Sequence, residues 1–366
     1  MSSTSVAPPV LRSGRVASYG TNLGTALFGA WLTAGVALDA WAHNTRSDLE
    51  SFWTPWHAVL YSGFVAVAAW VLWHARGAWR TRPLDLPAIP AGYTPAVAGV
   101  VLFALCGMGD ATWHTIFGIE QNINILFSPT HLGLGAAMVL ILTAPVRSAA
   151  ADPAVPADPG LRRLLPAVLS GAFATIVVLL LLQYANAMTM SSTDVVLGVS
   201  EAGGGGFASR LATTVVVTGL LLTVPLVAIA RRWAPPFGTV TIIYTAVAAF
   251  CAAITGLEDP AMVLWLPPAG LVLDALARWV LRPAPDRPAR VLAFAGVAPL
   301  VTWAAYLAAA FAAAPDFMLA PAIGGGRPEP VVEVYTGLPV VQALLGILVA
   351  AVLAPPKPRP AAEALP

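Results

Sequence analysis

Long apolar runs of about 20 residues alternate with short polar segments along most of the chain. An α-helix of that length spans the hydrocarbon core of a bilayer, which is about 30 Å thick. We therefore expect an all-α, polytopic integral membrane protein embedded in the lipid bilayer. The pattern predicts about ten membrane-spanning helices, near residues 23–43, 56–75, 94–114, 127–146, 164–188, 209–230, 238–257, 260–280, 290–313 and 335–354.

The composition supports this class of protein. Hydrophobic residues make up 58% of the chain and charged residues only 10%, whereas soluble domains have about 25% charged residues. The formal net charge is +1, which gives no electrostatic reason to expect a nucleic-acid partner.

The distribution of basic residues predicts the orientation in the membrane. If the N-terminus lies inside, 16 of the 19 Lys and Arg residues fall in inner segments, and only Arg46, Arg210 and Arg327 lie outside. Inner loops of membrane proteins carry an excess of Lys and Arg. We therefore expect a multi-pass protein of the cell membrane with both termini in the cytoplasm.

The predicted spans group into two parts, separated by an inner segment at 147–162 that is rich in Ala, Asp and Pro. The first four spans form two helical hairpins, and the last six form a second membrane half. The predicted organisation is a cytoplasmic tail at 1–22, a four-helix unit at 23–146 (hairpins 23–75 and 94–146), a six-helix half at 163–354 and a second cytoplasmic tail at 355–366.

Each of the two hairpins carries the same pattern of metal-ligand residues where one helix ends and the next begins. The first copy is Asp39, His43 and His57, and the second is Asp110, His114 and His131. The Asp pair and the first His pair are each 71 residues apart, and the later His pair is 74 apart. This offset predicts an internal helical-hairpin repeat, with both sites toward the extracytoplasmic side.

The spacing within each copy explains why these side chains could share one ion. Asp and His four residues apart lie on one face of a helix. The second His follows a Pro that suits the first turn of the next helix. One carboxylate and two imidazoles form a ligand set that suits copper, iron or zinc. The pattern uses four of the five His in the chain.

Two carboxylates and two thiols lie near these sites or within the predicted spans. Glu50 and Glu120 lie between the paired helices of each copy, and we expect each either to accept a hydrogen bond from an imidazole N–H or to be a solvated carboxylate. Cys106 and Cys251 lie inside predicted spans without a CxxC motif, so a thiolate metal site is not expected.

The ligand residues resemble those of the C subunit of the particulate methane and ammonia monooxygenases, which are copper-dependent membrane enzymes. The first set matches in Asp39, His43 and Phe52-Trp-Thr-Pro-Trp-His57, with one inserted residue. The second set matches in His114-Thr-Ile-Phe-Gly-Ile-Glu120 and Ser128-Pro-Thr-His131-Leu-Gly133, with Asp110 where the family often has Asn.

This resemblance covers about residues 25–145, and the remaining six spans have no counterpart in that subunit. It implies copper at both sites. The family enzymes also contain two other subunits, one with a soluble copper-binding domain that this chain lacks. Partner membrane subunits, or a homo-oligomer, are therefore expected.

Three functions fit the pattern. The first is oxidation of a small apolar substrate by copper, because two imidazoles and one carboxylate leave coordination positions open. The alternative is non-enzymatic copper transport, delivery or sensing, although the chain has no Met-rich or Cys-rich run that would select Cu(I). The third is a zinc-dependent lipid hydrolase, since three protein ligands plus water is also a catalytic zinc arrangement.

Overall fold

The computed structural model describes residues 15–46, 53–80, 85–118, 123–281, 287–314 and 329–353. Within these residues the secondary structure is helical, apart from one isolated bridge between Ser200 and Pro330. Nine helices in the described part of the chain are long and apolar enough to cross a membrane, and a shorter apolar helix at Thr239–Thr255 stands where the seventh span was predicted. The predicted all-α, multi-pass membrane architecture is confirmed, whereas the internal repeat stays a prediction.

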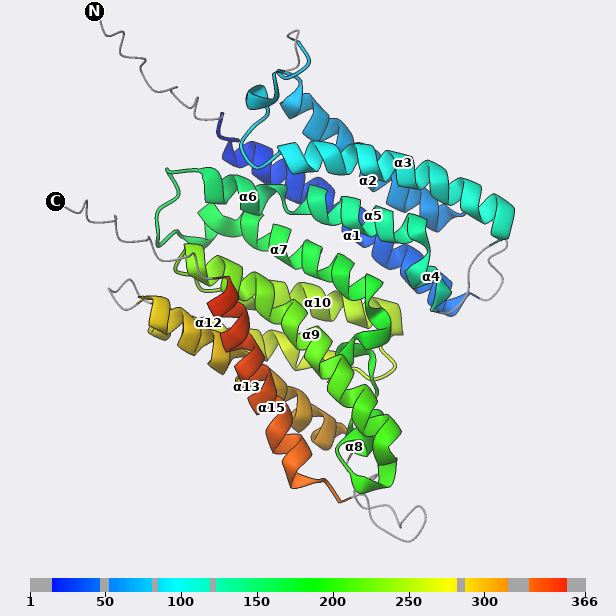
Figure 1. Ribbon diagram of the computed structural model, residues 1–366, viewed down its shortest axis with the longest axis vertical. Helices are drawn as coiled ribbons and strands as arrows, with labels where there is room; N and C mark the ends of the chain where they lie inside the picture. The colour runs from blue at the N-terminus through cyan, green and yellow to red at the C-terminus, as the bar shows by residue number, and fades with distance from the viewer. Residues whose placement is uncertain are drawn as a thin grey trace, which may run out of the picture. The chain divides into compact units, whose positions relative to one another are not determined.

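The chain forms two compact units, which are described separately. Unit 1 comprises residues 1–156 and 162–181, and unit 2 comprises residues 157–161 and 182–366. Figure 1 shows the helices of unit 1 in blue to green, namely α1 (Tyr19–Thr45), α2 (Pro55–Ala75), α3 (Thr94–Phe117), α4 (Asn124–Phe127), α5 (Pro129–Leu142), α6 (Ala144–Ala151) and α7 (Leu161–Leu181).

Local sequence signals set the beginnings of the helices that matter for function. Ser18 caps α1 by accepting a hydrogen bond from the backbone N–H of Thr21. Thr54 caps α2 in the same way, accepting from the N–H of His57 at 3.1 Å, and Pro55 follows it in the first turn. Such caps satisfy N–H groups that have no partner inside the helix. The cap on α2 therefore also fixes where His57 enters the helix.

Helices α1 and α2 pack as one antiparallel hairpin, and α3 and α5 as another. The α1–α2 pair depends on two glycines. A Cβ atom on Gly35 would lie 2.7 Å from Cα of Leu60, and one on Gly63 would lie 2.8 Å from Cα of Leu32. The two backbones can approach this closely only because neither glycine has a side chain at the crossing.

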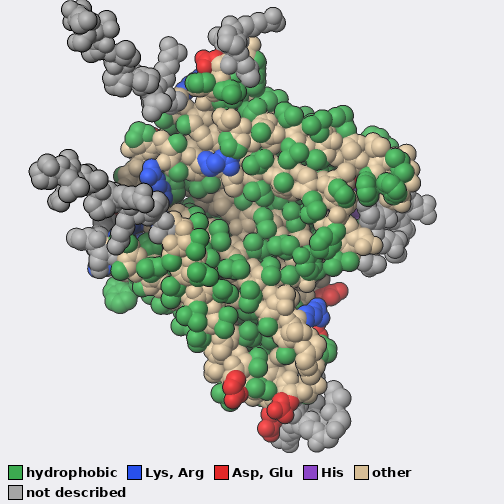
Figure 2. Space-filling view, in the orientation of Figure 1, with side chains coloured by type: hydrophobic (Ala, Val, Ile, Leu, Met, Phe, Trp, Pro, Cys, Tyr) green, Lys and Arg blue, Asp and Glu red, His purple; other side chains and the backbone are tan. Residues whose placement is uncertain are grey.

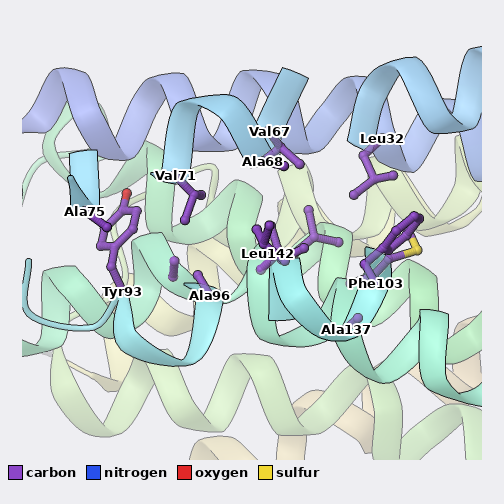
Figure 3. Close-up of a cluster of buried hydrophobic side chains, with 14 of the residues drawn as sticks. Leu32, Val67, Ala68, Val71, Ala75, Tyr93, Ala96, Phe103, Ala137 and Leu142 are labelled. Atoms are coloured by element: carbon purple, nitrogen blue, oxygen red, sulfur yellow. The ribbon is translucent and has the colours of Figure 1, made fainter. Parts of the chain in front are cut away.

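The core of unit 1 lies between these two hairpins. Leu32, Val67, Tyr93, Phe103 and Ala137 are fully buried there, and Figure 3 shows these side chains pointing into the space between the helices. Phe64 and Phe103 stack with ring centroids 4.0 Å apart. Outside this core many large apolar side chains are exposed, and Figure 2 shows them spread over the visible face with few charged groups among them. A surface of this kind suits contact with lipid.

Unit 2 contains the remaining helices, joined by short turns. They are α8 (Ser192–Gly198), α9 (Gly204–Arg232), α10 (Thr239–Thr255), α11 (Ala261–Leu264), α12 (Leu266–Val280), α13 (Arg287–Ala313) and α15 (Val332–Val352). Unit 2 also has 3₁₀ turns at Gln183–Ala185, Ala187–Thr189 and Glu201–Gly203, and unit 1 has one at Leu86–Ala88.

Asp274 of α12 joins α12 to α10 by hydrogen bonds. Its carboxylate accepts hydrogen bonds from Val240 N at 2.9 Å, Thr241 N at 3.0 Å and Thr241 Oγ1 at 2.6 Å, so it caps α10 from a neighbouring helix.

The fifth predicted span is corrected at its end. The sequence pattern placed a helix over 164–188, but α7 ends at Leu181 and two 3₁₀ turns follow. The side chain of Asn186 accepts a hydrogen bond from the N–H of Met188, and Thr218 of α9 accepts one from the N–H of Ala187. These side chains accept hydrogen bonds from backbone N–H groups that would otherwise bond within an α-helix. The apolar run therefore does not continue as an α-helix. Helix α7 also packs within unit 1, which therefore extends beyond the predicted boundary segment at 147–162.

Candidate metal centre

The first ligand set converges at one end of the α1–α2 hairpin. Asp39 and His43 are one turn apart near the end of α1, and His57 is in the first turn of α2. Oδ2 of Asp39 lies 3.8 Å from Nε2 of His43 and 3.7 Å from Nε2 of His57. The three potential ligand atoms all lie within 4.8 Å of one another, so a single ion between them could contact all three.

The second set converges in the same way in the α3–α5 hairpin. Oδ1 of Asp110 lies 3.5 Å from Nε2 of His114 and 3.1 Å from Nε2 of His131. The side chains of Asp110 and His114 are each 2% exposed, and that of His131 is 18% exposed. We call the first group the Asp39 triad and the second the Asp110 triad. They are the only groups of this kind within the described residues.

Hydrogen bonds on the outer side of the rings orient the imidazoles. Nδ1 of His131 is 2.7 Å from the carbonyl oxygen of Ile125, and Nδ1 of His114 is 3.3 Å from that of Gly118. Nδ1 of His57 is 3.0 Å from Oγ1 of Thr54. In metal sites the second ring nitrogen of a ligating His commonly bonds to such a group, which fixes the ring and its tautomer. The inner nitrogen, Nε2, is then directed at the carboxylate.

These contacts need a proton or a metal ion between Asp110 and its imidazoles. A carbonyl oxygen can only accept, so Nδ1 of His131 must carry a proton. The lone pair of a neutral ring would then face the negative Oδ1 of Asp110 at 3.1 Å, which is unfavourable without a positive charge between them. The repulsion is relieved by a proton, on Nε2 or on the carboxyl group, or by a metal ion. One metal ion balances the carboxylate and satisfies both imidazoles together.

The carboxylates differ in how they are supported. Oδ1 of Asp110 also accepts a hydrogen bond from Oγ1 of Thr130 at 2.8 Å. Oδ1 of Asp39 is buried and has no hydrogen-bond partner among the described residues. A buried carboxylate oxygen without a partner is costly. Coordination of a cation by Asp39 would remove that cost, so the donor set and its burial fit a metal ion.

The two triads are neighbours within unit 1. The imidazole rings of His57 and His114 have centroids 6.4 Å apart, a separation close to that between His43 and His57 inside the first triad, which is 5.9 Å. Asp39 is also within electrostatic range of Asp110 and His131. The six ligand side chains therefore form one cluster rather than two remote sites, and we call this cluster of six side chains the chamber.

His74 and Trp53 do not belong to either triad. His74, the fifth histidine, lies in the last turn of α2, and its Nδ1 is 2.9 Å from the carbonyl oxygen of Trp70. Trp53 is 86% exposed, which suits the membrane surface. Glu50 and Glu120, which were expected to accept from an imidazole N–H or to be solvated, lie outside the described residues.

Four residues that hold the ligand side chains by hydrogen bonds were not anticipated from the sequence, namely Thr54, Thr130, Ile125 and Gly118. Thr130 directly precedes His131, and a hydroxyl residue beside a candidate ligand is a signal that could have been used. Ile125 and Gly118 act through main-chain carbonyl oxygens, and every residue has one, so the sequence does not indicate which of them will bond to a histidine.

Comparison with known proteins adds no assignment to this geometry: no protein-family model, no curated protein and no solved structure matches the chain.

Proposed function

We propose that this multi-pass membrane protein binds two metal ions, one in the Asp39 triad and one in the Asp110 triad, and that the ions are copper. The observation that carries the proposal is the convergence of four imidazole Nε2 atoms on two carboxylates, at 3.1 to 3.8 Å, of which Asp110 is buried and Asp39 partly buried. Two imidazoles and one carboxylate suit copper, iron and zinc. The resemblance to the copper monooxygenase C subunit favours copper among these.

The activity that we propose is oxidation of a small apolar substrate at this chamber. Each triad supplies three ligands and leaves positions for further ones, and bound copper would supply the redox chemistry. The chamber lies in helices whose outer faces are apolar and exposed, for example at Leu105, Met108 and Ile116 of α3. A hydrocarbon dissolved in the bilayer would meet this surface first. The protein's own contribution is to orient the ligands and to keep the chamber largely out of water.

The orientation belongs to the same proposal. The excess of basic residues in the predicted inner segments supports cytoplasmic termini. The ends of α1 and α3 that carry the triads would then face the extracytoplasmic side.

The metal content of the purified protein in mild detergent tests the binding. After loading with copper and removal of the excess, we expect two ions per chain in the wild type and one in His114→Ala. The double variant His43→Ala/His114→Ala should hold none. His74→Ala is the matched control, because it removes the one histidine outside the triads, and it should keep both ions. Full occupancy of the double variant would refute the metal centre.

Oxygen consumption tests the activity. The copper-loaded wild type should consume oxygen with a small apolar substrate, and His114→Ala should not. A loaded protein without such turnover, whose His114→Ala variant alters copper tolerance of the host cell, would instead identify a protein of copper transport, delivery or sensing.

A further inference from the structure

Tyr61 lies beside the chamber without being one of the predicted ligands. It follows His57 by four residues on α2, so both side chains project from the same face of that helix. Their rings have centroids 6.3 Å apart and are tilted by 35°. Tyr61 is thus one helical turn further into the membrane-spanning segment than the ligand.

The packing around the ring directs its hydroxyl group toward α3. A Cβ atom on Gly107 would lie 3.0 Å from Cε1 of Tyr61 and 3.3 Å from its hydroxyl oxygen. Gly107 precedes Asp110 by three residues, so it belongs to the same face of α3 as that ligand. Phe103 holds the ring from the side, edge to face, at 5.9 Å. The absence of a side chain at Gly107 makes room for the phenol at this point.

The hydroxyl group is buried and lies near both triads. Its oxygen has almost no solvent-accessible surface. Tyr61 is within electrostatic range of both Asp110 and Asp39, the two carboxylates of the chamber. A buried phenol at this position costs desolvation that a phenylalanine would avoid.

The second hairpin has no counterpart to this tyrosine. The residue four positions after His131 is Gly135, and the space beside it is taken by the side chain of Leu181 from α7. One tyrosine therefore serves a chamber formed by two similar ligand sets. This asymmetry distinguishes Tyr61 from the repeated ligands.

We infer that the Tyr61 hydroxyl lies beside the two triads and donates a hydrogen bond to a small anionic or oxygen-containing ligand held there by the metal. The inference rests on the proposed metal centre. It makes Tyr61 a binding residue for the exogenous ligand, in addition to the six side chains that hold the ions. A phenol suits this position because it donates a hydrogen bond while it stays neutral.

Azide titration of the protein loaded with Cu(II) tests the inference, because azide bound to Cu(II) gives a charge-transfer absorption band. Tyr61→Phe keeps the ring and its packing and removes only the hydroxyl. We expect this variant to retain both ions and to bind azide about tenfold more weakly or worse, the effect of losing one hydrogen bond to a charged ligand. The matched control is Tyr93→Phe, which removes a buried hydroxyl bonded to Thr25 and Asn22 at the opposite end of α3.

Each outcome separates this inference from the proposed function. If the wild type and Tyr61→Phe hold two ions and bind azide within twofold of each other, Tyr61 is not a binding residue, whereas the metal centre stands. A loaded wild type that takes up no azide overturns the inference in the same way. A wild type that holds no copper overturns both. An equal loss of azide affinity in Tyr93→Phe would show a general effect of destabilising unit 1 and would also overturn the role of Tyr61.

Discussion

His57 of α2 and His114 of α3 belong to different triads, yet their imidazole ring centroids lie 6.4 Å apart. The separation between His114 and His131, within one triad, is 5.7 Å. Rings on two hairpins are therefore almost as close as rings that share a carboxylate. Ions bound by the two triads would be near neighbours.

This proximity predicts magnetic interaction between two bound Cu(II) ions. Electron paramagnetic resonance of the fully loaded wild type should show a broadened or diminished signal. His43→Ala and His131→Ala, which each leave one triad intact, should give ordinary signals of isolated Cu(II). A wild-type spectrum equal to the sum of the two single-site spectra would contradict the shared chamber.

Thr130 is expected to tune the Asp110 triad. Thr130→Val removes the 2.8 Å hydrogen bond to Oδ1 of Asp110 and keeps the size of the side chain. Loss of a hydrogen bond to a metal ligand typically lowers metal affinity by about 10- to 100-fold. Competitive titration with a chelator would measure the change at this site alone. Thr112→Val is the control, since that exposed hydroxyl bonds only to the carbonyl oxygen of Met108 in its own helix; an equal loss there would remove the specific role of Thr130.

The close crossing of α1 and α2 should be needed for the Asp39 triad. Gly35→Val places a side chain against the backbone of Leu60, so the helices must separate. Over-packing of this kind costs about 1 to 3 kcal/mol. We expect a lower melting temperature in detergent and loss of the ion from the Asp39 triad. Gly337→Val, at a position of α15 with open space around it, should change neither measurement.

Cysteine labelling from outside intact cells tests the orientation. In a chain with Cys106 and Cys251 replaced by Ala, we expect labelling at Trp53→Cys and Phe117→Cys, which lie at the triad ends of α2 and α3. Trp79→Cys, near the other end of α2, should be protected. All three native side chains are exposed, at 86%, 67% and 45% respectively. The reverse pattern would invert the proposed topology.

Asp274 should stabilise unit 2 without affecting the metal centre. Asp274→Ala leaves two main-chain N–H groups at the start of α10 without their acceptor. The expected loss is about 3 kcal/mol, measured by denaturant or thermal unfolding, with Asp274→Asn intermediate because it keeps one oxygen. Asp158→Ala, which removes a half-exposed carboxylate paired with Arg278 at 3.6 Å, should have little effect. Comparable destabilisation by both variants would argue against the capping role.

The sequence predicted features that depend on local geometry. The four-residue spacing of Asp39 and His43, and the proline before His57, define positions on a helix face and in a first turn, and the structure brings these residues together as that spacing predicts. The predicted end of the fifth span was wrong because Asn186 and Thr218 supply hydrogen bonds that an apolar pattern does not reveal. The neighbouring position of the two triads could not be predicted either, since it depends on how α2 packs against α3, at contacts such as that between Tyr61 and Gly107.

The composition of the chamber has a consequence for oxidation state. Asp39 and Asp110 bring two negative charges, and neutral imidazoles bring none. Two Cu(I) ions would make the centre electrically neutral, whereas two Cu(II) ions would leave an excess of two positive charges in a poorly hydrated space. Low polarity around a metal site shifts its reduction potential. The chamber should therefore favour the reduced ions and hold copper at a high potential, and a further small anion would be needed to stabilise the oxidised state.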